Sequence, residues 1–132
     1  MAEKLCKLRE YGGGSGMLTE TVLWTNPSPT ASRTGTNIIT LSQSYENFEY
    51  VRIDVDYLGE LGNIKGYIMT PSDLYNKLLY PCLSLGRFNA SGQYSNVRHI
   101  YSDSYSSITD VFDGTNSGWG VNCIITQVVG LK

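Results

Sequence analysis

Residues 48–58, Phe-Glu-Tyr-Val-Arg-Ile-Asp-Val-Asp-Tyr-Leu, show the clearest alternation of apolar and polar side chains in the chain. Successive side chains of a β-strand point to opposite faces of its sheet. One face of this segment would hold Val51, Ile53, Val55 and Tyr57. The other face would hold Arg52, Asp54 and Asp56. The pattern therefore predicts a strand with one side in a core and the other side in water.

Similar short segments, separated by Gly, Pro, Asn and Ser, occur along most of the chain. We expect further strands at residues 21–24, 37–41, 64–69, 82–88, 95–101, 107–112 and 121–129. Thr70 and Pro71 are typical of a helix start, and Pro81 limits that helix to residues 71–79. About eight short strands at such intervals predict an all-β protein, an antiparallel two-sheet β-sandwich of jelly-roll-like type with one short helix.

The chain divides into a short arm and one domain. Residues 12–16, Gly-Gly-Gly-Ser-Gly, remove local stiffness, so residues 1–17 are predicted to be an N-terminal arm and tether. The arm would either dock on a neighbouring protein or serve as a flexible tail. The remaining residues, 18–132, have the length of a single β-sandwich domain with one core.

Composition and charge narrow the classes of partner. The formal net charge is −2, and the Lys and Arg residues form no stripe, which argues against nucleic acid as a partner. No segment has the length and apolar character needed for membrane insertion or a signal peptide, so synthesis in the cytoplasm is expected. Cys6, Cys82 and Cys123 lack metal-ligand spacing and are predicted to be reduced thiols. No cofactor and no metal is predicted.

The last predicted strand, residues 121–129, breaks the alternation because both of its faces are apolar. Such a strand is either central and covered on both sides or part of a subunit contact. For the second case Ile124 and Val128 are the candidate interface residues.

Several segments of the chain resemble small β-sandwich domains of tail-fibre and minor virion proteins from tailed bacteriophages. They are Leu23-Trp24-Thr25-Asn26-Pro27-Ser28-Pro29, Ile39-Thr40-Leu41-Ser42, Tyr50-Val51-Arg52-Ile53 and the ending Cys123-Ile124-Ile125-Thr126-Gln127-Val128-Val129-Gly130-Leu131-Lys132. The resemblance covers residues 18–132. It implies a virion domain, often trimeric, that binds a bacterial surface or another virion protein, and it supplies no catalytic signature.

Aromatic residues are concentrated in the segment between Gly92 and Gly120, among Ser, Asn and Asp. Sugars are bound by flat aromatic rings under their CH faces and by short polar side chains around their hydroxyls. The candidate ligand-binding residues are Tyr94, Tyr101, Asp103, Tyr105, Asn116 and Trp119. The alternative is that Trp119 and some of the tyrosines cap the core at one end of the sandwich.

Three other chemical roles have less support from the sequence than sugar binding. His99, the single histidine, lies in a predicted strand, where a hydrogen-bonded structural role is the usual one. Asp54 and Asp56 could serve a glycoside hydrolase, but both are expected on a solvated face beside Arg52. Four acidic or amide residues could offer oxygen ligands to calcium, although their spacing matches no known loop and solvated turns explain them better. They are Asp103, Asp110, Asp113 and Asn116.

Together these features predict a non-enzymatic bacteriophage virion or tail-fibre-associated protein that acts in virion assembly or host attachment. Its partners would be other virion proteins and a bacterial surface glycan, and a homo-oligomer, preferably a trimer, is expected. It would reside in the virion after synthesis in the bacterial host cytoplasm. The alternatives are a free carbohydrate-binding module and, third, a small glycoside hydrolase.

Overall fold

The computed structural model describes residues 17–29, 35–57, 64–76, 82–88, 94–113 and 123–132, and it describes only the backbone of residues 86–88, 94–97 and 113. Residues 1–16 of the predicted arm and tether, with the thiol of Cys6, therefore lie outside the described residues. Nothing in the described ranges tests the proposed boundary at residue 18.

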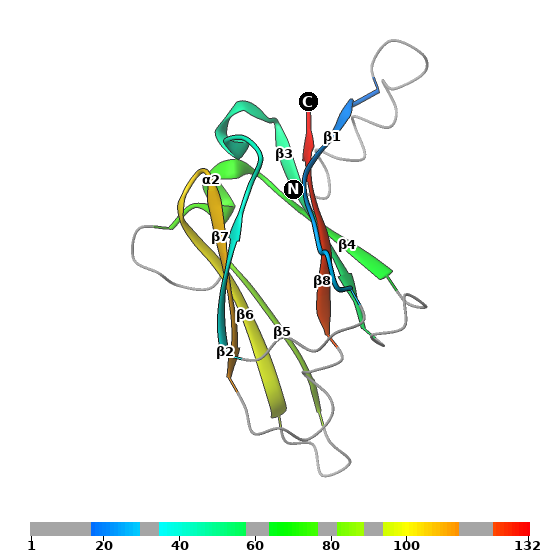
Figure 1. Ribbon diagram of the computed structural model, residues 1–132, viewed down its shortest axis with the longest axis vertical. Helices are drawn as coiled ribbons and strands as arrows, with labels where there is room; N and C mark the ends of the chain where they lie inside the picture. Colours follow the sequence, from blue (N-terminus) through cyan, green and yellow to red (C-terminus); the bar gives the residue numbers. More distant parts are fainter. Residues whose placement is uncertain (1–16, 30–34, 58–63, 77–81, 89–93, 114–122) are drawn as a thin grey trace.

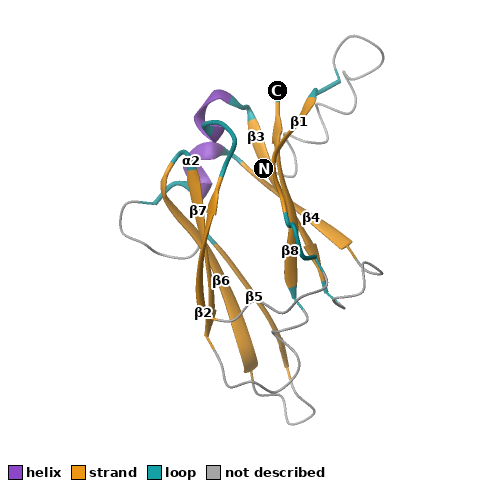
Figure 2. Cartoon of the chain, in the orientation of Figure 1, coloured by secondary structure: helices purple, strands orange, loops and turns teal. Residues whose placement is uncertain are grey.

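Two antiparallel four-stranded sheets face each other (Figures 1 and 2). Sheet A has the strand order β1 (Glu20–Thr25), β8 (Ile124–Leu131), β3 (Tyr50–Asp56), β4 (Ile64–Met69). Sheet B has the order β2 (Gly35–Thr40), β7 (Ser107–Asp113), β6 (Tyr94–Ser104), β5 (Leu83–Phe88). The predicted all-β, two-sheet sandwich is confirmed. The first strand pairs with the last and the second with the seventh, which is the jelly-roll-like part of the topology.

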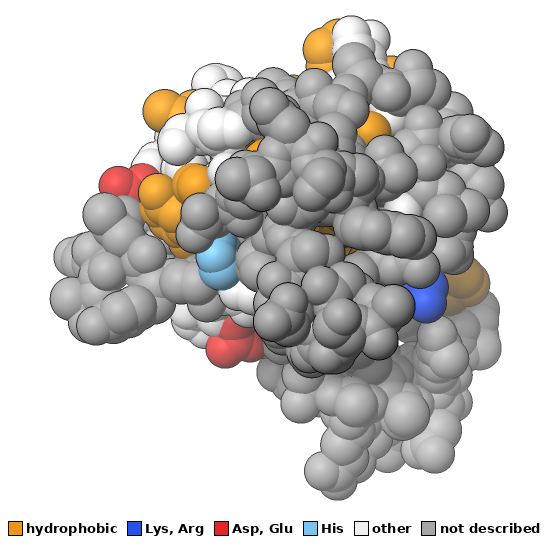
Figure 3. All heavy atoms as spheres, turned by 90° about the horizontal axis from the view of Figure 1, so that it is seen from below, with side chains coloured by type: hydrophobic (Ala, Val, Ile, Leu, Met, Phe, Trp, Pro, Cys, Tyr) orange, Lys and Arg blue, Asp and Glu red, His pale blue; other side chains and the backbone are white. Residues whose placement is uncertain are grey.

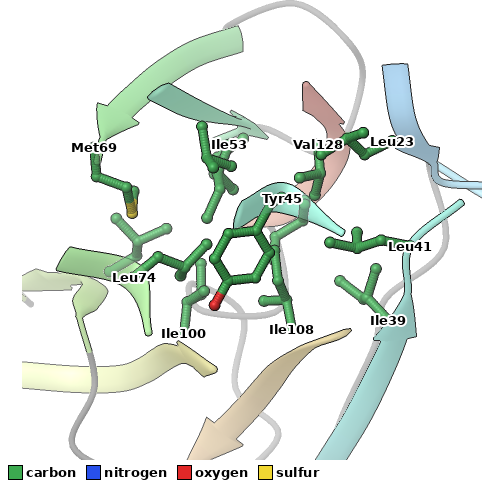
Figure 4. Packing of buried hydrophobic residues seen from close by; sticks show 14 of the residues in the cluster. Leu23, Ile39, Leu41, Tyr45, Ile53, Met69, Leu74, Ile100, Ile108 and Val128 are labelled. Carbon is green, nitrogen blue, oxygen red and sulfur yellow. The ribbon is translucent and has the colours of Figure 1, made fainter. Parts of the chain in front are cut away.

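The core lies between the two sheets and is built from the apolar rows that the alternation predicted. Ile53 of sheet A and Ile100 and Ile108 of sheet B are all completely buried. Figure 4 shows side chains from both sheets meeting around Tyr45, which belongs to the 3-10 turn η1 (Tyr45–Asn47) at one end of the sandwich. Apolar burial between the sheets is therefore the main force that holds them together.

The helix is shorter than predicted. Thr70 caps it through a capping box with Asp73, as the sequence indicated, but α2 covers only Pro71–Leu74. Tyr75 is already extended and forms a bridge with Ser102 of β6, and the Asn76 amide donates to the Ser102 carbonyl at 2.6 Å. The prediction that the helix continues beyond residue 74 is wrong, because the chain joins sheet B there.

Strand β8 is a central strand, which is one of the two alternatives that the apolar pattern of residues 121–129 predicted. It lies between β1 and β3, and every one of its described side chains except Gln127 is buried. Val128 points into the core between the sheets and is 0% exposed, and Ile124 is 2% exposed. In this fold neither residue offers an exposed apolar surface to a second subunit.

The outer face of β3 is less solvated than predicted. Asp56 is completely buried, and Arg52 and Asp54 are half-buried. Each of these residues has a neighbour on both sides, because β3 is flanked by β4 and β8; Asp56 lies between Ile64 and Ile124 in the register. The alternation correctly predicted which side chains of β3 share a face. It did not predict how far neighbouring side chains would cover the outer face.

Candidate functional site

The structure does not bring the six predicted ligand-binding residues together. Tyr94 begins β6 and Tyr105 follows its last residue, Ser104. An eleven-residue strand at about 3.3 Å per residue separates these positions by roughly 35 Å. Asn116 and Trp119 lie outside the described residues, beyond the end of β7. Tyr94 and Tyr105 therefore cannot belong to one binding surface, whereas a platform of Tyr105 with Trp119 stays a prediction.

Tyr105 is enclosed by other tyrosines instead of offering a free ring face. Its ring stacks on Tyr75 with centroids 4.3 Å apart, and it meets Tyr45 edge to face at 5.2 Å. The Tyr45 hydroxyl donates to Ser102 Oγ at 2.8 Å, in the same buried corner. Tyr75 and Tyr105 both pack against the main core. For Tyr105 this geometry matches the alternative role of a core cap, and Asp103 lies exposed near the same end.

Tyr101 belongs to a different surface, the outer face of sheet B. The register pairs it with Thr109, whereas its neighbours Ile100 and Ser102 are buried on the inner side. At the paired positions of this sheet, the described side chains that point outward are Thr36, Ile38, Thr40, Ser84, His99, Tyr101, Ser104, Ser107, Thr109 and Val111. None of them is Lys, Arg, Asp or Glu. We call this set the hydroxyl face. Asp103 is exposed at the irregular step of β6 between Tyr101 and Ser104, outside this paired set.

The hydroxyl face is open to solvent along its edges and carries both polar and apolar groups. Ile38 is 68% exposed, and Thr36, Thr40 and Ser84 are also exposed. His99 Nδ1 lies 3.0 Å from Ser84 Oγ, and the pale blue histidine side chain reaches the surface in Figure 3. His99 therefore has the hydrogen-bonded role predicted for it.

The outer face of sheet A differs in character, because it is charged and partly apolar. Arg52 forms ion pairs with Glu20 of β1 and with Asp54, the latter at 2.8 Å. A small second cluster, Tyr50, Val129 and Leu131, is buried on the same face and is joined by Leu18 and Ile68. Ion pairs of this kind are common on protein surfaces that face solvent. The described residues of the hydroxyl face contain no such ion pairs.

The pair Asp54 and Asp56 lacks the access that glycoside hydrolysis requires. Asp56 is completely buried, so a polymeric substrate has no route to its carboxyl group in this fold. Both Asp54 oxygens accept from Arg52, at 2.8 and 3.2 Å. The geometry gives this pair a structural role.

A buried ion pair in the core was missed by the sequence interpretation. Arg98 of β6 donates through Nη1 to both carboxylate oxygens of Asp110 on β7, at 2.8 and 2.7 Å. The two side chains are 0% and 1% exposed, and the Arg98 guanidinium also lies 5.5 Å from the Phe112 ring centroid. The prediction that Asp110 is a solvated turn residue is wrong, because it lies within β7 and faces the core. Its alternation with the apolar Ile108 and Phe112 was the available signal that it faces inward.

The oxygen ligands considered for calcium do not converge. Asp110 is committed to Arg98 in the core, whereas Asp103 is exposed near the β6–β7 turn. Asp113 has only its backbone described, and Asn116 lies outside the described residues. Within the described ranges, no three His, Cys, Asp or Glu side chains are grouped so that they could hold a metal ion.

The two described cysteines are free thiols with suppressed ionisation. Cys123 is buried in the core, and desolvation raises its pKa from 9.0 to about 12. Desolvation also raises the pKa of the half-buried Cys82 to about 11, and its thiol donates to the Ile100 carbonyl at 3.1 Å. Burial raises the pKa of Tyr45 to about 12 as well. All three groups are therefore neutral near pH 7 and are poor nucleophiles.

These shifts predict a loss of stability in alkaline solution. Between pH 9 and about 12 the folded chain keeps protons that the unfolded chain releases, so the free energy of unfolding falls as pH rises. Urea denaturation at pH 8, 9, 10 and 11 measures this effect. We expect a falling midpoint whose slope is smaller in a Cys82→Ala/Cys123→Ala variant. A midpoint that stays level or rises over this range contradicts the prediction.

Comparison with known proteins adds no family assignment. No family model matches the chain, and no curated protein or solved structure matches it. The described part of the chain also contains no helix that is long and apolar enough to span a membrane.

Proposed function

We propose that this chain is a non-catalytic binding and assembly protein whose recognition surface is the hydroxyl face of sheet B. The observation that carries the proposal is the outward set of Thr, Ser, Tyr, His, Val and Ile side chains, with no Lys, Arg, Asp or Glu at the paired positions whose side chains are described. Such a surface offers hydroxyl groups for hydrogen bonds and ring or alkyl surface for CH groups. It suits a neutral, hydroxyl-rich ligand.

A neutral bacterial surface glycan fits this chemistry best. Tyr101 supplies a ring in the middle of the sheet, and Ile38 supplies an exposed alkyl group at its edge. Thr109 lies directly opposite both in the register, on the central strand β7. The ligand class is inferred from this mixture of groups, since aromatic and short hydroxyl side chains make adaptable contacts at low entropy cost.

The setting we propose is a bacteriophage virion or tail fibre, in which the domain would act in host attachment or virion assembly. The resemblance of its strand and turn sequences to small tail-fibre sandwich domains supports this setting. The two-sheet architecture is compatible with it. The same surface would serve a free carbohydrate-binding module, and the two differ in whether the chain is recovered in virions.

A charge placed in the centre of the hydroxyl face tests its role. Thr109→Lys is expected to weaken binding at least about tenfold, on the order of 1.4 kcal/mol, because a long cation would occupy the ligand position. The measurement is binding of the full chain to an array of neutral bacterial surface polysaccharides.

The matched control is Thr25→Lys, which changes an exposed threonine at the end of β1 in sheet A. We expect this variant to bind as the unaltered chain does. Equal binding by both variants, with both folded by circular dichroism, would remove the hydroxyl face as the recognition surface.

A further inference from the structure

Strand β2 presents a free edge at one side of sheet B. Among the strands that the structure describes it pairs only with β7, so one row of its backbone groups points away from the sheet. The Leu41 amide donates to the Ser106 carbonyl at 2.9 Å, so residues 39, 37 and 35 also direct their backbone groups toward β7. The backbone N–H and C=O groups of Thr36, Ile38 and Thr40 therefore point to the free edge.

The other three edges of the sandwich carry features that discourage pairing with another chain. Strand β1 has the charged Glu20 and an irregularity between Val22 and Trp24. Strand β4 contains the exposed Lys65. Strand β5 contains Arg87 and a register shift beside it. Charges and bulges are the usual protection of edge strands.

Strand β2 has none of these protections. Its six residues, Gly-Thr-Asn-Ile-Ile-Thr, include no charge and no proline, and its register with β7 is continuous. Ile38 in its centre is 68% exposed, and Thr36 and Thr40 are exposed on either side. An uncharged edge of this kind is a template for strand addition.

We propose that the occupant of this edge is β2 of a second copy of the chain, paired antiparallel about a two-fold axis at Ile38. The residues with free backbone groups read Thr36, Ile38, Thr40, which is the same in both directions. An axis at Ile38 places Ile38 opposite Ile38 of the second copy and Thr36 opposite Thr40 of the second copy. In each opposed pair, the N–H and C=O groups of both residues then point at the other strand, as a hydrogen-bonded antiparallel pair requires.

Self-pairing is favoured over a different partner by this symmetry and by charge. The strand has no charged group to attract a charged edge, and none that would repel its own copy. The two B sheets would become one continuous sheet of eight strands, and their hydroxyl faces would lie on the same side. The pairing itself does not depend on what the hydroxyl face binds.

Sedimentation equilibrium of the full chain tests the proposal. We expect a species of twice the 14.6 kDa chain mass, and we expect Ile38→Lys to be monomeric because two like charges would be opposed at the axis. The matched control is Val22→Lys. Val22 is 50% exposed on the edge strand β1. Thr19 and Lys132 exchange both backbone hydrogen bonds, so by alternation the amide of Val22 points away from β8, just as the amide of Ile38 points away from β7. This variant should stay dimeric.

The register is tested separately by oxidation of an Ile38→Cys variant in a Cys6→Ser background. Opposed residues of a hydrogen-bonded antiparallel pair have Cα atoms about 5.5 Å apart, within disulfide range. We expect a disulfide-linked dimer for Ile38→Cys and none for Val22→Cys. A monomeric or trimeric unaltered chain, a dimer that survives Ile38→Lys, or cross-linking through Val22→Cys alone would each overturn the proposal.

Discussion

Replacing Asp110 with alanine is expected to lower the free energy of unfolding by about 3–5 kcal/mol. Arg98 and Asp110 are both essentially unexposed, and the carboxylate accepts two short hydrogen bonds from the same guanidinium nitrogen. Removing the carboxylate leaves the Arg98 charge in the core without its counterion. The cost of burying that charge, more than the loss of the attraction itself, sets the size of the effect. Urea denaturation followed by tryptophan fluorescence measures it.

Two further variants separate this explanation from a simple loss of packing. Asp54→Ala removes one of the two acidic partners of Arg52, whose side chain is 23% exposed, and we expect a loss of about 1 kcal/mol or less, because water reaches that pair and Glu20 remains. An Arg98→Met/Asp110→Leu double variant removes both charges and should recover most of the stability lost in Asp110→Ala. A double variant as unstable as the single one would show that burial of an unpaired charge is not the cause.

The second large effect is expected for Tyr45→Ala, at about 3–5 kcal/mol. Tyr45 is 0% exposed and fills the end of the core between the sheets, where Leu74, Ile100 and Ile108 surround it in Figure 4. Deletion of its ring leaves a cavity and also removes the edge-to-face contact with Tyr105. The change in thermal and urea stability measures the cost.

Tyr45→Phe divides this cost into its parts. It keeps the ring and removes only the hydroxyl that donates to Ser102 at 2.8 Å, so we expect a loss of about 0.5–1.5 kcal/mol. If Phe and Ala at this position were equally destabilising, the hydrogen bond and not the ring would hold this end of the sandwich together. That result would contradict the packing described here.

Much of the fold was predictable because its strands obey strict alternation. Strand β4 has the predicted bounds, and β3 has its apolar row, Val51, Ile53 and Val55, completely buried. The capping residues Thr70 and Asp73 marked the start of α2 correctly. Its early end was not predictable from residues 71–79, because it depends on a backbone bridge between Tyr75 and Ser102 on a strand distant in the sequence.

The candidate site was less predictable, because proximity in sequence does not mean proximity in a sheet. Tyr94, Tyr101 and Tyr105 are close along the chain, yet β6 carries Tyr94 and Tyr105 to opposite ends of the sandwich and leaves Tyr101 between them. The hydroxyl face combines residues from four strands, so only the strand order of sheet B assembles it. The inward position of Asp110 could have been predicted from its alternation with Ile108 and Phe112, but its pairing with Arg98 could be found only from the β6–β7 register.

The recognition role of the hydroxyl face is tested most directly by NMR titration of the isotope-labelled chain with neutral bacterial surface polysaccharides. We predict that the amide shifts which change on binding cluster in residues 36–40 of β2, around His99 and Tyr101 of β6, and in residues 107–111 of β7. Changes confined to the tyrosine-capped end around Tyr105, or to the ion-paired face around Arg52, would contradict this account, as would the absence of any change across the panel.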